Sequence, residues 1–160
     1  MNKVWLLAFP YVLCISNPVS AGQVGSSPIQ IKVPESVIAE VIKYQTETSS
    51  QPVWSGDFIL ATEIVNVSSE TQHLTTWTCS YEFMWSINRT EIKIVPSSCR
   101  SNYVKGFDLA PNTSYPQKLK LQVTSKTNDE LVFSVMFRVG RNKVASNPVR
   151  LILKQKSSYP

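Results

Sequence analysis

The chain has 160 residues, 42% of them hydrophobic and 17% charged, with a formal net charge of +5. This apolar content excludes a disordered chain, the 5 glycines exclude a collagen-like repeat, and the 3 cysteines are too few for a disulfide-packed mini-protein. The length fits one globular domain, with or without a targeting segment. Because the sequence contains no basic run typical of nucleic-acid binding, we expect no nucleic-acid partner.

Residues 1–21 have the pattern of a secretory signal peptide. Lys3 precedes an apolar run at 4–15, and small residues occupy a cleavage position at 19–21. The run is too short for a membrane anchor, which needs about 20 apolar residues, and no later segment approaches that length, so we expect no membrane span. The alternative is a buried N-terminal strand or helix. The pattern predicts export to the periplasm or the extracellular space.

The cysteines predict one disulfide. If Cys14 leaves with the signal peptide, Cys79 and Cys99 remain as a pair in an oxidising compartment. A bridge that closes a loop of about 20 residues stabilises a fold by about 3 kcal/mol on the chain-entropy model. Two cysteines and one distant histidine do not make a zinc site, and no Cys-x-x-Cys pair is present. We therefore expect a structural bridge, no metal and no cofactor.

The first elements after the signal peptide are mixed in pattern. Residues 29–33 read as a strand. Residues 36–45 carry apolar side chains at helical spacing but are rich in β-branched residues, so the pattern favours a short helix and leaves a strand open. A polar linker follows at 46–52. Residues 58–67 are apolar on both faces, which is typical of a strand near the centre of a sheet.

The middle of the chain predicts an aromatic strand at 77–85, with Cys79 facing inward beside Trp77 and Trp85. A short strand follows at 92–94. Strict alternation of apolar and polar residues then predicts three strands that face one core, at 118–124, 131–139 and 149–154.

These elements predict an all-β protein, an antiparallel immunoglobulin-like β-sandwich of about seven to eight strands with at most one short helix. The intervals between strands are too short for crossover helices, which excludes a parallel βαβ architecture. The chain would then consist of a removed signal peptide at 1–21, a single domain at 22–155 and a flexible tail at 156–160.

Leu109-Ala-Pro-Asn-Thr-Ser-Tyr115 resembles the Leu-x-Pro-x-Thr-x-Tyr corner of fibronectin type III domains. The resemblance implies that Tyr115 is a structural corner residue whose hydroxyl bonds to the backbone. Residues 146–149 also resemble the entry to the last strand of such domains. The chain departs from that family at Pro116 and in having three strands after the corner instead of two, so the resemblance supports the class of sandwich and not membership.

A second, fainter resemblance is to the bacterial intracellular proteinase-inhibitor family. It rests on the Asn-x-Ser turn at Asn66, the central aromatic residue Trp85 and the Leu-x-Pro turn at Leu109. The family implies a sandwich fold. A signal peptide and a cysteine pair are unlike an intracellular inhibitor.

Catalytic patterns are weak. His73 is the only histidine, and no nucleophile or orienting carboxylate stands near it in the sequence. Asp129 and Glu130 fall in a turn, where acids commonly serve hydrogen bonding and solubility. Phosphate-binding loops and metal-ligand motifs are absent from the sequence. We therefore do not expect an enzyme.

Three surfaces are candidates for binding. The first is a basic stripe on the outward faces of the last three strands. The alternative interpretation is that these cations are solvated and protect the edges of the sheet from pairing with other chains. The second is the set of outward apolar residues on the same strands, Val132, Met136 and Ile152, which another chain or the N-terminal segment would cover. The third is the loop at 96–102, with Arg100 and Ser101 at its tip. The predicted stripe consists of Lys118, Lys120, Arg138, Arg150 and Lys154.

The loop with Arg100 and Ser101 beside a cysteine resembles the reactive loop of small trypsin inhibitors. The sequence therefore predicts an exported, non-catalytic binding or structural module that acts through protein-protein interaction, with a protease inhibitor using the Arg100 loop as the alternative. It identifies neither the protein partner nor the oligomeric state.

Overall fold

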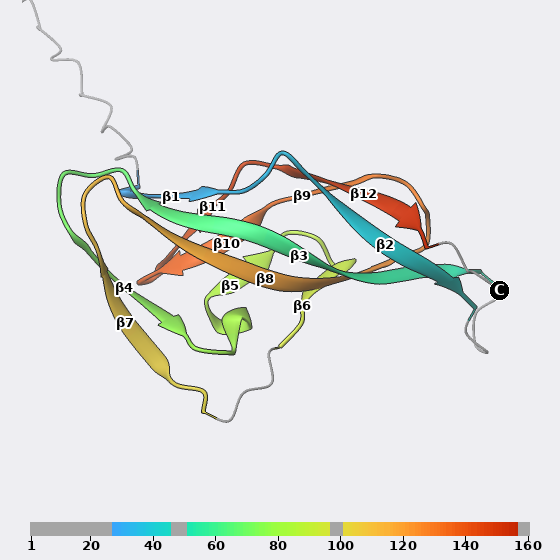
Figure 1. Ribbon diagram of the computed structural model, residues 1–160, viewed down its shortest axis with the longest axis horizontal. Coiled ribbons are helices and arrows are strands. Elements are labelled where there is room, and N and C mark those ends of the chain that lie inside the picture. Colours follow the sequence, from blue (N-terminus) through green and yellow to red (C-terminus); the bar gives the residue numbers. More distant parts are fainter. Residues whose placement is uncertain (1–26, 46–50, 97–100, 157–160) are drawn as a thin grey trace, which may run out of the picture.

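The computed structural model describes residues 27–45, 51–96 and 101–156. Within these ranges the protein is almost entirely β, with twelve strands and one short 3-10 turn (Figure 1). This confirms the all-β expectation. The elements are β1 (Ile29–Lys32), β2 (Ser36–Tyr44), β3 (Val53–Asn66), β4 (Gln72–Trp77), η1 (Tyr81–Phe83), β5 (Trp85–Ile87), β6 (Ile92–Ile94), β7 (Val104–Leu109), β8 (Ser114–Ser125), β9 (Leu131–Phe133), β10 (Val135–Val139), β11 (Asn142–Ala145) and β12 (Val149–Gln155).

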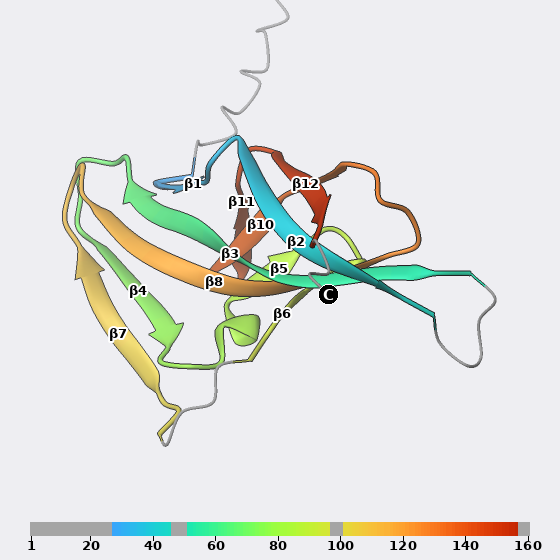
Figure 2. The same ribbon diagram turned by 45° about the vertical axis from the view of Figure 1, so that its right-hand side comes forward.

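Three sheets make up the described chain. The largest has the order β6-β8-β3-β2-β12-β9, with β1 paired to β3. A second sheet has the order β11-β10-β5, and β4 and β7 form a separate two-stranded ribbon. Figure 2 shows this ribbon projecting from one end of the large sheet. The predicted signal peptide, Cys99, Arg100 and the tail from residue 157 lie outside the described residues.

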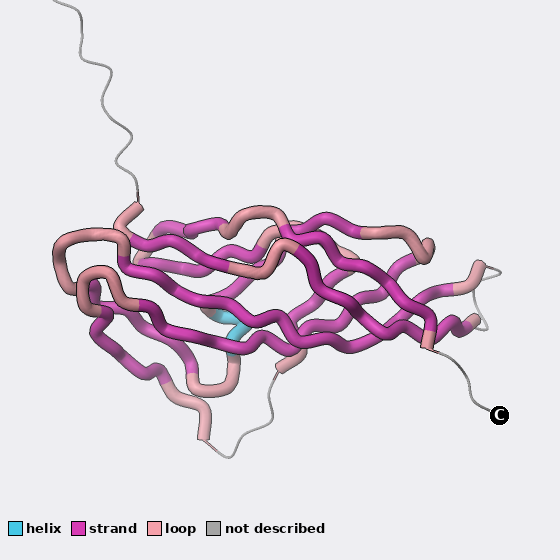
Figure 3. The backbone as a smooth tube through the Cα atoms, turned by 45° about the horizontal axis from the view of Figure 1, so that its top comes forward, coloured by secondary structure: helices cyan, strands magenta, loops and turns pink. Residues whose placement is uncertain are grey.

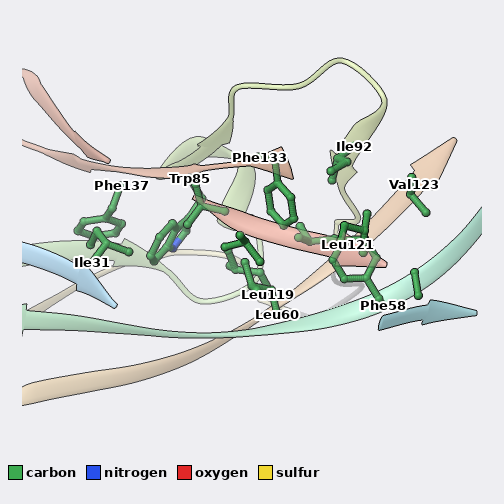
Figure 4. Packing of buried hydrophobic residues seen from close by; sticks show 14 of the residues in the cluster. Ile31, Phe58, Leu60, Trp85, Ile92, Leu119, Leu121, Val123, Phe133 and Phe137 are labelled. Carbon is green, nitrogen blue, oxygen red and sulfur yellow. The ribbon is translucent and has the colours of Figure 1, made fainter. Parts of the chain in front are cut away.

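The core fills the space between the large sheet and the three-stranded sheet, as expected of a sandwich-like fold. Figure 4 shows Trp85 and Phe137, from the smaller sheet, on the opposite side of the core from Leu60 and Leu119 of the large sheet. The rings of Trp85 and Phe137 are 4.8 Å apart, and all four side chains are fully buried. Burial of these large apolar groups is the main force that holds the two sheets together.

The prediction of a helix at residues 36–45 is wrong, because this segment forms strand β2. Its β-branched residues suit a strand, and β2 finds partners on both sides. It pairs in parallel with β12 and in antiparallel fashion with the start of β3. Figure 2 shows β2 running obliquely across β3. At this crossing the backbone carbonyl of Glu40 lies so close to Gly56 that no side chain could be accommodated there.

The prediction of a single strand at residues 77–85 is also wrong. Strand β4 ends at Trp77, the 3-10 turn η1 intervenes, and β5 begins at Trp85 (Figure 3). Cys79 and Trp85 are buried as expected, but Trp77 is half-buried and Phe83 is 54% exposed. Trp77 therefore ends a strand of the ribbon, and Tyr81 is partly buried against the edge of the core.

The strand expected at 131–139 is divided at Ser134. Residues before it form β9, which pairs with β12 in the large sheet, and residues after it form β10 in the three-stranded sheet. The chain therefore crosses from one sheet to the other while its odd-numbered side chains from Leu131 to Phe137 stay buried. Among the described residues, no helix is long and apolar enough to span a membrane.

Candidate binding surfaces

The basic residues expected to form one stripe do not lie on one continuous surface. Lys118 and Lys120 are on β8, and Arg150 and Lys154 are on β12. These strands belong to the same sheet, but β3 and β2 lie between them. Arg138 is on β10, in the three-stranded sheet. All five positions are exposed as predicted, but the strands that carry them are not neighbours.

Two of these cations are engaged in ion pairs. Lys120 Nζ lies 3.0 Å from Asp57 Oδ2. The Arg150 guanidinium donates two hydrogen bonds to Glu130, of 2.7 and 2.8 Å. These hydrogen bonds lower the pKa of the Glu130 carboxyl below its ordinary value, with the positive charge of Arg150 adding to the effect. The bidentate pair fixes the chain just before the short edge strand β9.

An apolar surface lies on the outward face of the large sheet. Ile38 and Ile152 are directly opposite each other in the parallel pair of β2 and β12. Val132 on β9 is opposite Arg150, two residues from Ile152 on the same face. Ile38 is 49% exposed, Val132 is 50% exposed and Ile152 is half-buried. We call these three residues, Ile38, Val132 and Ile152, the outer patch.

Met136 is not part of the outer patch, contrary to expectation. It is half-buried on β10, in the three-stranded sheet, opposite Ser86 and Ala145. The division of the predicted strand at Ser134 is the reason, since Val132 and Met136 end in different sheets.

A pocket of about 300 Å³ lies where the ribbon approaches β8. Trp77 from β4, Tyr81 from η1 and Tyr115 from β8 contribute aromatic rings to its lining. Lys105 from β7 and Lys118 from β8 contribute cations. Figure 1 shows the ribbon and η1 on the same side of β8. Trp77 and Tyr115 were expected to be structural residues only, and the structure places both at this pocket.

Gln117 also lines this pocket and connects it to the core. The residue is 9% exposed, and its Oε1 accepts a hydrogen bond of 3.0 Å from Nε1 of the buried Trp85. Sequence analysis did not single out Gln117. Its position was a usable signal, because it has the same strand parity as the buried residues Leu119 and Leu121.

Tyr115 does not make the backbone hydrogen bond that the fibronectin-like corner implies, as far as the described residues show. Its ring stacks on Phe107 of β7, with centroids 4.5 Å apart. Tyr115 therefore joins the ribbon to the large sheet by ring stacking.

His73 and Asp108 face each other across the ribbon, where His73 Nδ1 lies 2.6 Å from Asp108 Oδ1. Both side chains are largely exposed, at 78% and 69%. Within the described ranges, no group of three or more histidine, cysteine, aspartate or glutamate residues could hold a metal ion. The two side chains form a hydrogen-bonded pair on the surface of the ribbon.

Ser101 lies at the end of the predicted loop, next to the ribbon. Its carbonyl oxygen accepts a hydrogen bond from Thr78 Oγ1 and lies 3.8 Å from Cys79 Sγ. Arg100, the residue expected at the loop tip, is outside the described residues. No protein-family model matches the chain, and no curated protein sequence matches it.

Proposed function

We propose that this protein is an exported, non-catalytic binding module with an immunoglobulin-like fold, which acts by binding another protein at the outer patch. The observation that carries the proposal is the pairing of Ile38 with Ile152 on an outward sheet face, beside Val132. Soluble monomers rarely expose contiguous apolar surface of this kind unless it binds something.

The surroundings of the outer patch resemble a protein-binding surface. The Arg150 and Glu130 ion pair borders Val132, and Lys154 is opposite Glu40 beyond Ile152. An apolar centre with charged residues around it is the usual composition of a protein-protein interface. Because the patch lies on paired strands of a sheet, a partner would meet a preformed surface.

Export is supported by the predicted signal peptide and by the surroundings of Cys79. Cys79 is buried, and its sulfur lies 3.8 Å from the carbonyl oxygen of Ser101, two residues after Cys99 in the chain. These observations support the proposed bridge between Cys79 and Cys99, a bond typical of oxidising compartments.

The non-catalytic part of the proposal is supported by the setting of the single histidine. His73 is exposed and paired with Asp108. Among the described residues, no serine hydroxyl and no cysteine thiol forms a hydrogen bond with it. An activated nucleophile needs a base within hydrogen-bond reach in a site sheltered from water.

The test compares capture of partners from the native envelope fraction by matched variants. Ile38→Thr and Ile152→Thr keep β-branched side chains but remove apolar surface from the outer patch. Val104→Thr is the control, because Val104 is 52% exposed on β7, in the separate ribbon. We expect a protein to co-purify with the wild type and the Val104 variant and to be lost with the patch variants. Equal capture by all four proteins contradicts the proposal.

A protease inhibitor is the second candidate, favoured by the anchoring of the chain after the Arg100 loop. Thr78 N–H donates to the Tyr103 carbonyl, and Thr78 Oγ1 donates to the Ser101 carbonyl. Such anchoring would hold a substrate-like loop in place. Arg100→Ala should then abolish inhibition of a trypsin-like protease, and lack of inhibition by the wild type excludes this function.

A further inference from the structure

The pocket between the ribbon and β8 has the composition of a ligand site. Its aromatic lining comes from three separate elements, through Trp77, Tyr81 and Tyr115. One face of Tyr115 is covered by Phe107, and Trp77 packs against Phe83 with ring centroids 5.1 Å apart. These contacts hold the rings in place, so the pocket is formed before any ligand arrives. Its volume of about 300 Å³ is at the lower end of the range for small-molecule sites.

Gln117 gives the pocket a hydrogen-bond donor that the fold itself does not use. Its Oε1 is occupied by the Trp85 indole, which also fixes the orientation of the amide. In the described part of the chain, no group accepts a hydrogen bond from its Nε2, although the residue is only 9% exposed. Among the described residues, the buried side-chain nitrogen without a partner is Arg89 Nε, so Gln117 Nε2 is open to solvent and available to a ligand in the pocket.

Lys105 and Lys118 bring positive charge to the same pocket. Neither ammonium group is paired with a carboxylate of the described residues, whereas Lys120, two residues along β8, is paired with Asp57. No aspartate or glutamate of the described chain lines the pocket. The Thr76 and Thr78 hydroxyls already donate to backbone carbonyls. The donors left for an anionic ligand are therefore the Gln117 amide, the two ammonium groups and the tyrosine hydroxyls.

We propose that this pocket binds a sugar residue that carries a carboxylate, of the uronic acid type. The apolar C–H face of a sugar ring packs on aromatic rings, its hydroxyls exchange hydrogen bonds with amide and hydroxyl groups, and its carboxylate accepts from lysine. An acidic peptide would share only the last of these features and would need a longer groove. This site is separate from the outer patch, because β3 and β2 lie between β8 and β12.

The test is a titration of the isotope-labelled protein followed by its indole and glutamine side-chain NMR signals. The probes are glucuronate, galacturonate, mannuronate and sialic acid, with glucose, acetate and a tetraglutamate peptide as comparisons. We expect at least one acidic sugar to shift the Trp77 and Gln117 signals saturably, with a dissociation constant on the order of 1 mM for so small a ligand. Glucose should bind about fivefold more weakly, since it lacks the contact with lysine.

Three variants locate the site. Lys118→Met keeps the apolar stem and should weaken binding about fivefold, whereas Lys120→Met, the matched control, should leave it unchanged. Gln117→Glu keeps the acceptor for Trp85 but replaces the free donor by a carboxylate oxygen, so binding should fall about tenfold or more. The Trp85 indole signal reports whether this variant keeps its fold.

Three results overturn the proposal. These are the absence of a saturable shift with every acidic sugar, equal binding of acetate, and tighter binding of the tetraglutamate peptide at the same signals. Equal effects of Lys118→Met and Lys120→Met would also overturn it. The Ile38→Thr and Ile152→Thr variants should bind the sugar normally, so failure of the outer-patch proposal leaves this one standing.

Discussion

The side-chain nitrogen of Asn66 donates a hydrogen bond of 2.8 Å to the backbone carbonyl of Leu109, 43 residues later. Asn66 ends β3, where the chain leaves the large sheet for the ribbon, and Leu109 ends β7, where the chain returns to it. The same Asn66 nitrogen donates to the Glu70 carbonyl, and its Oδ1 accepts from both the backbone and the hydroxyl of Ser68. One buried side chain therefore joins the ribbon to the sheet.

Asn66→Ala should destabilise the protein by about 2–4 kcal/mol, because the buried Leu109 carbonyl and the partly buried Glu70 carbonyl lose their donor and the turn at Ser68 loses its acceptor. Urea denaturation measures the free energy of unfolding. Asn142→Ala is the control, since Asn142 is exposed on β11, and should change stability by less than about 0.5 kcal/mol. Equal effects of the two substitutions would show that the Asn66 bonds do not hold the ribbon.

Gly56→Ala should also be strongly destabilising. An added Cβ would lie 2.1 Å from the Glu40 carbonyl oxygen, a backbone atom that moves only if β2 moves. We expect a loss of about 1–3 kcal/mol or more, measured as a lower thermal midpoint. Gly106→Ala tests specificity, because the nearest atom there is the Leu74 carbonyl oxygen at 4.0 Å. If Gly106→Ala lowers the thermal midpoint more than Gly56→Ala does, the close crossing of β2 and β3 is not the reason that position 56 requires glycine.

The sequence predicted much of the core because alternation follows burial directly. Leu119, Leu121 and Val123 are fully buried, as their spacing indicated. The same alternation of apolar and polar residues could not show that the chain changes sheets at Ser134. Both sheets bury side chains in one shared core, so the alternation continues across the break. Local pattern reports which side chains are inside, not which strand is the neighbour.

Whether residues 36–45 form a helix or a strand depends on contacts with residues that are distant in the sequence. Its apolar residues satisfy both helical and strand spacing, so local pattern does not decide between them. Pairing of Ile38 with Ile152, more than a hundred residues later, settles it as a strand. The pocket was missed for a similar reason, because Trp77 and Tyr115 meet only once the ribbon folds back beside β8.

The proposed disulfide predicts a redox-sensitive stability. Cys79→Ser should lower the free energy of unfolding by about 3 kcal/mol, because it opens a loop of about 20 residues in the unfolded chain. Reduction of the wild type should have a similar effect and none on the variant. Intact-mass measurement with and without reductant should show a gain of two hydrogen atoms in the wild type alone. A wild type that gains no mass on reduction excludes the bridge.

The ion pair between Arg150 and Glu130 predicts a loss of stability in acid. The hydrogen bonds from Arg150 lower the pKa of Glu130 in the folded protein. A group whose pKa is lower when folded stabilises the protein at every pH above its unfolded value, and this contribution is lost as the pH falls through the folded value. The difference in unfolding free energy between the wild type and Glu130→Gln should therefore be constant above the ordinary glutamate pKa and should fall away as the pH drops through the lower folded value. Glu70→Gln, at an exposed position, should show no such dependence.

Because Arg150 and Glu130 are both exposed, the difference in unfolding free energy between the wild type and Glu130→Gln should be small and should shrink with added salt. A difference that persists unchanged at pH 2 would show that charge is not its origin.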